Sequence, residues 1–175
     1  MTAVEAGTAV VARHVALTGG DLAAVETAWA ARTPSAALRR SSRMLGRGYV
    51  RLLDRLWPDD GDRRRPAEPS ARRRQVSRPV ALGMIAARAG LDAEHVARQV
   101  GYDDAQTIAS ATLKLAPVDP VTATRWVLDA HALVEDLVTR TAHLTAASDI
   151  PAGGAPLVEL WAEIHATTTE RLFSA

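Results

Sequence analysis

The chain has 175 residues, which suits one domain and leaves too little for two large ones. Hydrophobic residues make up 47% of it, enough to build a core. Cysteine is absent, which excludes disulfide scaffolds, thiolate zinc sites, iron–sulfur clusters and cysteine nucleophiles. Charged residues interrupt every apolar run before it reaches the about 20 residues of a membrane span, so we expect a cytoplasmic protein without a membrane segment or signal peptide.

The net charge of +1 conceals an uneven distribution. Residues 32–78 carry 14 arginines and five acidic residues, a net charge of +9, whereas the other residues carry 7 basic and 15 acidic side chains, a net charge of −8. Such asymmetry is typical of a surface that meets an acidic protein or a nucleic acid, but a solvated loop can have the same composition.

Apolar residues recur at helical spacing and nowhere alternate over a long stretch, which predicts an all-α fold. We expect a single helical bundle over residues 1–175, with about six to seven helices and one long Arg-rich loop. The first helix should reach about Leu17 and end at Gly19, and Asp21 should cap the second. The third should lie between Pro34 and Pro58, with arginines facing outward opposite an apolar stripe of Leu38, Leu45, Tyr49, Leu52 and Leu56.

Residues 58–78 have no apolar periodicity, three prolines and two arginine triplets, and we expect them to form a flexible loop. Pro79 then begins a helix that is apolar nearly all round, which we place at the centre of the bundle. The next helix should run from Asp92 to Pro117, with Gly101 as a candidate break.

Two further helices complete the predicted bundle. The longest should begin at Asp119 and Pro120 and carry a seam of Val127, Ala130, Val134, Leu137, Thr141 and Leu144. The last should begin at Pro156 and continue to the end of the chain, with a buried stripe of Leu157, Leu160, Trp161, Ile164 and Leu172.

The five histidines occur singly on different predicted helices, so no catalytic set is evident and we expect neither a cofactor site nor a permanent metal site. Asp92 with His95 and His131 with Glu135 are the only His and carboxylate pairs at helical spacing. An enzyme would require a pair such as His131 and Glu135 to converge in a pocket with a displaced pKa.

A row of arginines on the third helix and the two triplets after it could bind phosphates: Arg39, Arg43, Arg47, Arg51, Arg55, Arg63 to Arg65 and Arg72 to Arg74. A small helical nucleic-acid-binding protein that uses Arg39 to Arg74 is therefore an alternative. It is disfavoured because residues 58–78 contain no aromatic side chain for base stacking and no recognition-helix motif follows. Gly46-Arg47-Gly48 lacks the phosphate-loop pattern, and its glycines indicate close helix packing instead.

Four segments and the chain end together resemble the UreF family of urease accessory proteins. The segments are ARTPS (31–35), RRSSRMLGRGYVRLL (39–53), RPVALGMIAARAGL (78–91) and SATLKLAPVDP (110–120), and the chain ends on a Pro-led helix with His165 and then Arg171-Leu172-Phe173. The resemblance covers about Ala28 to the C-terminus. The segment with which the family usually opens has no counterpart before Met1, so an N-terminally shortened form is expected.

The sequence departs from the family pattern at four further places. At the chain end Ser174 follows Phe173 directly, where the family commonly has one residue between them. Arg78 stands where the family often has His, Lys114 where it has Arg, and Asp119-Pro120 where it has Gly-Gln.

The resemblance implies a chaperone, not a catalyst, which bridges a UreD-type protein and a UreG-type GTPase on apo-urease and helps to insert nickel. It also implies a homodimer, which the shortened start would favour by leaving apolar surface uncovered. Residues 171–175 are expected to be a recognition tail. The predicted partner-binding residues are Arg171, Leu172, Phe173, His165, Arg43 and Arg47.

Overall fold

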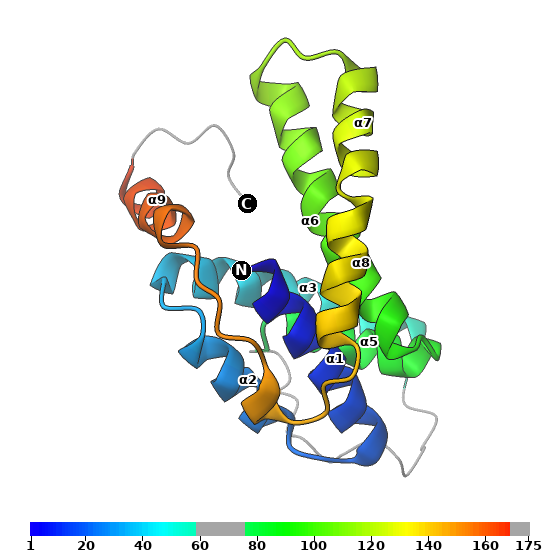
Figure 1. The fold of residues 1–175 in the computed structure, drawn as a ribbon. Helices are drawn as coiled ribbons and strands as arrows, with labels where there is room; N and C mark the ends of the chain where they lie inside the picture. The colour runs from blue at the N-terminus through cyan, green and yellow to red at the C-terminus, as the bar shows by residue number, and fades with distance from the viewer. Residues whose placement is uncertain (59–75, 169–175) are drawn as a thin grey trace.

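The computed structural model describes residues 1–58 and 76–168, and helices make up most of them (Figure 1). No strand occurs in these two ranges, so the predicted all-α fold is confirmed. The described ranges contain eight α-helices and one 3₁₀ helix: α1 (Thr2–Thr18), α2 (Leu22–Ala31), α3 (Ala36–Leu56), α5 (Arg78–Ala89), α6 (Ala93–Leu115), α7 (Pro120–Asp129), α8 (His131–Thr141), η1 (Ala147–Asp149) and α9 (Pro156–Thr167). None of these helices is both long and apolar enough to cross a membrane.

The ends of most helices follow the predicted capping signals. Asp21, Asp92 and Asp119 each accept a hydrogen bond from a backbone N–H in the first turn of α2, α6 and α7. Gly19 and Gly90 end α1 and α5 in the left-handed conformation, with φ values of 76° and 73°.

Helices α1 and α5 cross at the centre of the bundle, as predicted for α5. Small residues permit this crossing, because a Cβ at Gly83 would lie 2.4 Å from the carbonyl oxygen of Ala9. Helix α6 packs on α1 from another side. As a result α1 is buried almost all round at Val4, Ala6, Gly7, Thr8, Ala9, Val10, Val11 and Ala12.

The predicted longest helix is interrupted at Ala130, where ψ is −11° and the backbone N–H points to the carbonyls of both Trp126 and Leu128. The segment therefore forms two helices, α7 and α8. The number of described α-helices is thus eight, above the expected six to seven. The interruption contains neither Pro nor Gly. The longest described helix is instead α6, with 23 residues. It is continuous through Gly101, where the missing Cβ lets Val134 and Leu137 of α8 pack closely, so the candidate break is wrong.

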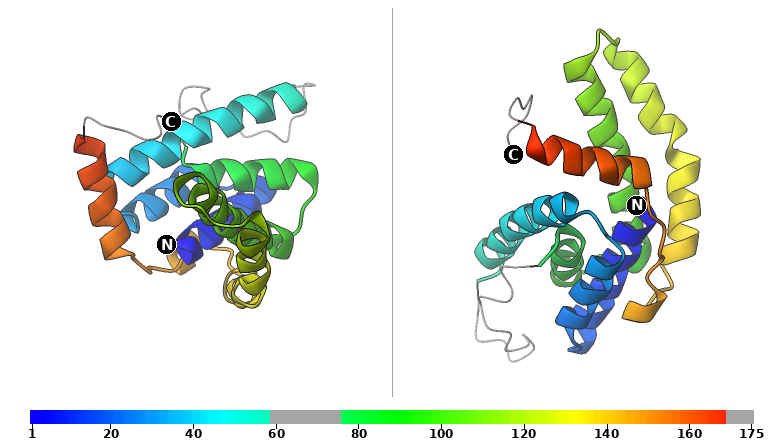
Figure 2. Two further views of the ribbon diagram at one scale, coloured as in Figure 1. Left: turned by 90° about the horizontal axis from the view of Figure 1, so that it is seen from above. Right: turned by 90° about the vertical axis from the view of Figure 1, so that its left-hand side faces the viewer.

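The C-terminal half of α6 and helix α7 project from the body as a two-helix arm, and α8 returns to it (Figures 1 and 2). The C-terminal part of the predicted seam is buried where α8 and the residues after it meet the body: Val134, Leu137, Thr141 and Leu144.

Helix α3 buries a different face from the predicted stripe. Its buried residues are Ser42, Gly46, Val50 and Leu53. Of the predicted stripe, Leu45, Leu52 and Leu56 are exposed, and Leu38 and Tyr49 are half-buried. The physical reason is the close approach of the backbone before α5, since a Cβ at Gly46 would lie 2.1 Å from the carbonyl oxygen of Val76.

The predicted loop over residues 58–78 is wrong at its C-terminal end. Val76 and Ser77 are buried, and Arg78 is the first residue of α5. The loop's central part, residues 59–75, lies outside the described residues.

Candidate protein-docking surface

Helix α9 lies at the edge of the molecule (Figures 1 and 2). Its apolar side chains are exposed to solvent. The predicted buried stripe is therefore wrong: Leu157, Leu160, Trp161 and Ile164 are 69%, 54%, 67% and 52% exposed. The less exposed side of the helix consists of two alanines and two glutamates, Ala162, Ala166, Glu159 and Glu163. The helix thus presents its apolar face outward, the reverse of the usual amphipathic arrangement in a bundle.

The carboxylate of Glu163 connects α9 to the N-terminus of α3. Glu163 Oε1 accepts hydrogen bonds from the Ser35 hydroxyl at 2.6 Å and from the Ala37 backbone N–H at 2.8 Å. These two bonds, the backbone bond first, hold the pKa of Glu163 below its usual value. A shallow hollow of about 350 Å³ lies beside the contact, lined by Pro34, Ser35, Ala36, Glu159, Leu160 and Glu163.

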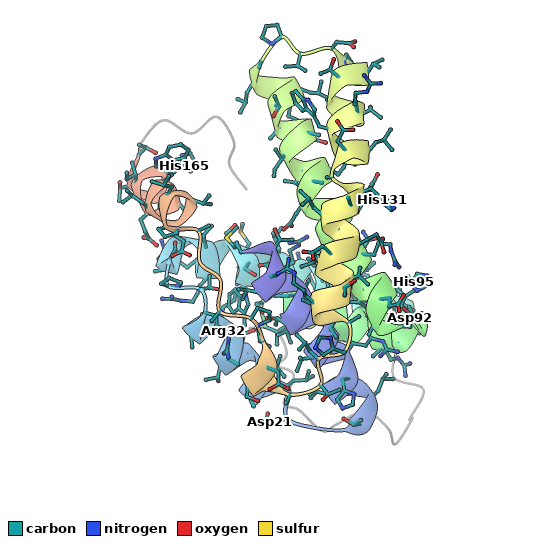
Figure 3. The ribbon with its side chains drawn as sticks, in the orientation of Figure 1. Asp21, Arg32, Asp92, His95, His131 and His165 are labelled. Carbon is teal, nitrogen blue, oxygen red and sulfur yellow. The ribbon has the colours of Figure 1, made fainter. Side chains whose placement is uncertain are left out.

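The segment that leads into α9 is held by Arg32, which is labelled in Figure 3. Its guanidinium donates to the backbone carbonyls of Ile150 at 2.7 Å and Ser148 at 3.0 Å, and also to that of Ala28 in α2, the helix that Arg32 caps. Arg32 belongs to the ARTPS segment, so this motif connects α2 to the chain that positions α9.

Of the six predicted partner-binding residues, the structure describes Arg43 and Arg47 on α3 and His165 on α9. His165 is exposed on the last turn of α9 (Figure 3). Arg47 is exposed on α3. Arg171, Leu172 and Phe173 lie outside the described residues.

Arg43, the remaining predicted residue, makes internal contacts rather than facing outward as predicted. Its Nε donates to Glu26 Oε1 at 2.9 Å, and its guanidinium lies 5.6 Å from the ring centre of Trp29. The other oxygen of Glu26 accepts a hydrogen bond from the Ser77 backbone N–H at 2.8 Å. Glu26 thereby joins α2, α3 and the start of α5.

Arg78 is the centre of a partly buried ion-pair cluster that joins α1, α5 and α6. It donates to Glu5 at 2.7 Å, to Asp104 at 3.3 Å and to Asp103. Burial raises the pKa of Glu5 even though the guanidinium opposes this, and Asp104 adds to the rise. Burial also opposes the charge of Arg78, but Glu5 and Asp104 outweigh it and raise the pKa of Arg78.

In each of the two His and carboxylate pairs the carboxylate also has another partner. Asp92 Oδ1 and His95 Nδ1 lie 2.7 Å apart on the surface, where Asp92 caps α6. Glu135 accepts two hydrogen bonds from Arg98, at 2.6 and 2.8 Å, and these lower its pKa. Within residues 1–58 and 76–168 no group of three or more His, Asp or Glu side chains could hold a metal ion.

Sequence reasoning missed the roles of Glu26, Glu163 and Arg78. The partners of these residues lie far away in the chain: Glu163 and Ser35 are 128 positions apart, and Arg78 and Glu5 are 73 apart. The available signal was local in each case, namely an isolated Glu on a predicted helix and an Arg before the helix-starting Pro79.

Comparison with known proteins matches this chain to the family that the sequence motifs resemble. The profile of the UreF family matches residues 2–131, a stretch that includes α1 and α2 and ends before α9. The motifs covered about Ala28 to the C-terminus, so the profile match begins earlier and ends earlier and only overlaps that range.

Curated relatives from mycobacteria carry the name urease accessory protein UreF. The chain is 34% identical to the Mycobacterium marinum protein over 145 residues, which are 83% of this chain and 63% of the relative. It is 33% identical to the Mycobacterium tuberculosis H37Rv protein over 144 residues, 82% of this chain and 62% of the relative. The matched region thus spans less than two thirds of these relatives. The profile match over most of the chain and these identities show that the chain belongs to the UreF family.

Proposed function

We propose that this chain is a urease accessory protein that acts as a scaffold. In this role it bridges a UreD-type protein and a UreG-type GTPase on apo-urease in the cytoplasm, so that nickel reaches the urease site as cargo. Membership of the UreF family and the names of the mycobacterial relatives support this proposal. No step of the proposed function requires chemistry on this chain.

The observation that carries the proposal is the outward apolar face of α9. A tryptophan that is 67% exposed beside three exposed aliphatic side chains is costly to leave in water and is typical of a protein interface. We propose that the UreD-type protein docks on this face and that Trp161 is its main anchor. His165 and the tail residues Arg171, Leu172 and Phe173 would extend the same contact.

The polar attachment of α9 supports a docking role over a structural one. Glu163 holds the helix at one end of α3, while the two alanines beside it bury little apolar area. A partner can therefore cover the apolar face without displacing core packing.

The test is a binding measurement between the full chain and the UreD-type protein of the same organism. Trp161→Ala should weaken binding by about 30-fold or more, because such anchors contribute about 2 kcal/mol or more. Trp126→Ala on α7, also exposed, is the matched control and should bind normally. Normal binding by Trp161→Ala would remove α9 as the docking site, and no binding by the unaltered chain would remove the bridging function.

We also propose a homodimer, because exposed apolar side chains extend over α6, α7 and α8 as well as α9, among them Ile108, Leu115, Leu128 and Leu133. Sedimentation velocity over a range of concentrations tests this, and a monomer at every concentration would contradict it.

A further inference from the structure

A second exposed surface lies on the outer side of α3, which runs along the opposite side of the body from α8 (Figure 2). Three leucines form one row on it, since positions 45, 52 and 56 differ by seven and four residues. Leu45, Leu52 and Leu56 are 48%, 44% and 57% exposed. These leucines are part of the predicted stripe that the fold does not bury.

A row of cations runs beside the leucines. Arg47, Arg51 and Arg55 follow at four-residue steps and are all exposed. None of the ion pairs in the described ranges involves these three residues, unlike Arg43 on the same helix. The outer face of α3 therefore combines an apolar row with a row of three positive charges.

Gly48 lies between the two rows and packs against none of the described residues. A Cβ at this position would meet no atom of residues 1–58 or 76–168 within 4 Å, whereas one at Gly46 would meet backbone atoms. Packing against the described residues therefore does not account for Gly48. A glycine within a helix costs about 1 kcal/mol of stability relative to alanine, and at Gly48 no close contact with these residues requires it. The absent side chain leaves a shallow place where another backbone can approach α3.

We propose that the outer face of α3 docks an amphipathic helix of a partner protein, with acidic residues along one flank. Its apolar side chains pack on Leu45, Leu52 and Leu56, its carboxylates pair with Arg47, Arg51 and Arg55, and its closest approach is at Gly48. The charge of the face specifies an acidic partner, and the parallel rows at helical spacing specify a helix.

The geometry favours a protein helix over a membrane or a nucleic acid. A membrane-bound helix places cations on both sides of its apolar row, but here the arginines occupy one side and the buried face of α3 borders the other. Phosphates of a nucleic acid would engage the arginines and leave the leucines exposed.

This inference goes beyond the proposed function, because the face is separate from the outer side of α9. Helix α9 contacts the N-terminal end of α3 at Ser35 and Ala37, whereas the docking face begins at Leu45 and extends toward the other end. Loss of one interaction therefore does not imply loss of the other.

The test uses a synthetic helical peptide of about 20 residues with leucines spaced seven and four apart and a neighbouring row of glutamates. Fluorescence anisotropy measures its binding to the full chain. The variant Arg47→Glu/Arg51→Glu/Arg55→Glu and the variant Leu52→Ser/Leu56→Ser should each bind it at least 10-fold more weakly. Arg125→Glu and Leu128→Ser/Leu133→Ser, which alter exposed residues of α7 and α8, are controls that should bind normally.

Charge reversal provides a result that misfolding cannot imitate. A peptide in which lysines replace the glutamates should bind the triple-glutamate variant better than it binds the unaltered chain. Circular dichroism melting establishes that each variant is folded.

Four outcomes would overturn the proposal. The first is that a scrambled peptide of the same composition binds equally well, and the second is that the α3 variants bind the peptide as the unaltered chain does. The third is that phosphatidylglycerol vesicles or duplex DNA bind more tightly than the peptide and depend on the same α3 residues. The fourth is that the chain self-associates and that the triple variant abolishes this. The third result would assign the face to a membrane or a nucleic acid, and the fourth to a second copy of this chain.

Discussion

Gly46 of α3 lies so close to Val76 that a Cβ on the glycine would stand 2.1 Å from the valine carbonyl oxygen. This contact sets the separation between α3 and the residues that begin α5. A Cβ on Gly48, two positions later on the same helix, would meet no atom of the described residues within 4 Å. The two glycines of one motif therefore have opposite structural meaning.

We predict opposite effects on stability from alanine at these two positions. Gly46→Ala should lower the free energy of unfolding by about 1 to 3 kcal/mol, because the methyl group forces α3 away from backbone atoms that cannot yield. Gly48→Ala should raise it by about 0.5 to 1 kcal/mol through better helix propensity. Urea unfolding measures both, and equal effects would contradict the close contact.

Arg78→Met should destabilise the protein most at neutral pH. Without the guanidinium, Glu5, Asp103 and Asp104 lie close together with no cation between them. The free energy of unfolding should fall by about 2 to 4 kcal/mol at pH 7. This loss is smaller than that expected for breaking a fully buried ion pair, because Asp103 is 43% exposed.

The sign of its pH dependence follows from Glu5, whose folded-state pKa is raised. The folded state then binds protons more tightly than the unfolded state, so the variant should regain stability as the pH falls from 7 toward the carboxylate pKa of the unfolded chain. Arg140→Met is the matched control, since its pair with Asp136 is exposed and should matter by about 0.5 kcal/mol or less. A loss that is independent of pH would contradict the cluster.

Glu163→Gln should loosen α9 without unfolding the bundle, because it weakens the two bonds to the N-terminus of α3. Hydrogen exchange should become faster in α9 and in the first turn of α3, with little change in α1 and α5. Glu94→Gln, which removes an exposed charge on α6, serves as the control.

The same attachment should weaken in acid. The pKa of Glu163 is lowered, so its contribution is present above the unfolded-state pKa and is lost as the pH falls through the lower folded-state value. Exchange in α9 that does not respond to pH or to the substitution would show that other contacts hold the helix.

Substitutions of Arg43 and of Arg47 should change the free energy of unfolding by different amounts, although both residues were predicted to bind a partner. Arg43→Met removes the pair with Glu26 and should cost about 1 kcal/mol, a modest value because the arginine side chain is 37% exposed. Arg47→Met should change stability by about 0.5 kcal/mol or less. If only Arg47→Met also weakens binding of the acidic peptide, Arg43 is structural and Arg47 belongs to the docking face.

Helix boundaries were predictable from the sequence because their signals are local. Asp21, Asp92 and Asp119 cap helices through atoms two or three residues away, and Gly19 and Gly90 end them through their own backbone conformation. The central position of α5 followed from its apolar composition in the same way.

The buried faces of α3 and α9 could not be predicted because they depend on partners that the local pattern does not contain. On α3, periodicity selected the large leucines, but the neighbouring backbone requires the small Ser42 and Gly46. On α9, the apolar stripe was real, but the only described helix it packs against closely offers a polar N-terminus to Glu163. The candidate docking surface is the result of this mismatch between pattern and neighbour.

The central position of α1 has a consequence for synthesis on the ribosome. Its main partners, α5 and α6, come much later in the chain, and Glu5 is translated 73 residues before Arg78. At about 5 to 20 residues per second, that separation corresponds to about 4 to 15 seconds. During this interval a helix rich in valine and alanine is in water without the surfaces that later enclose it. Arg78 is only the first residue of α5, so the nascent chain stays open to aggregation until α5 and α6 are complete.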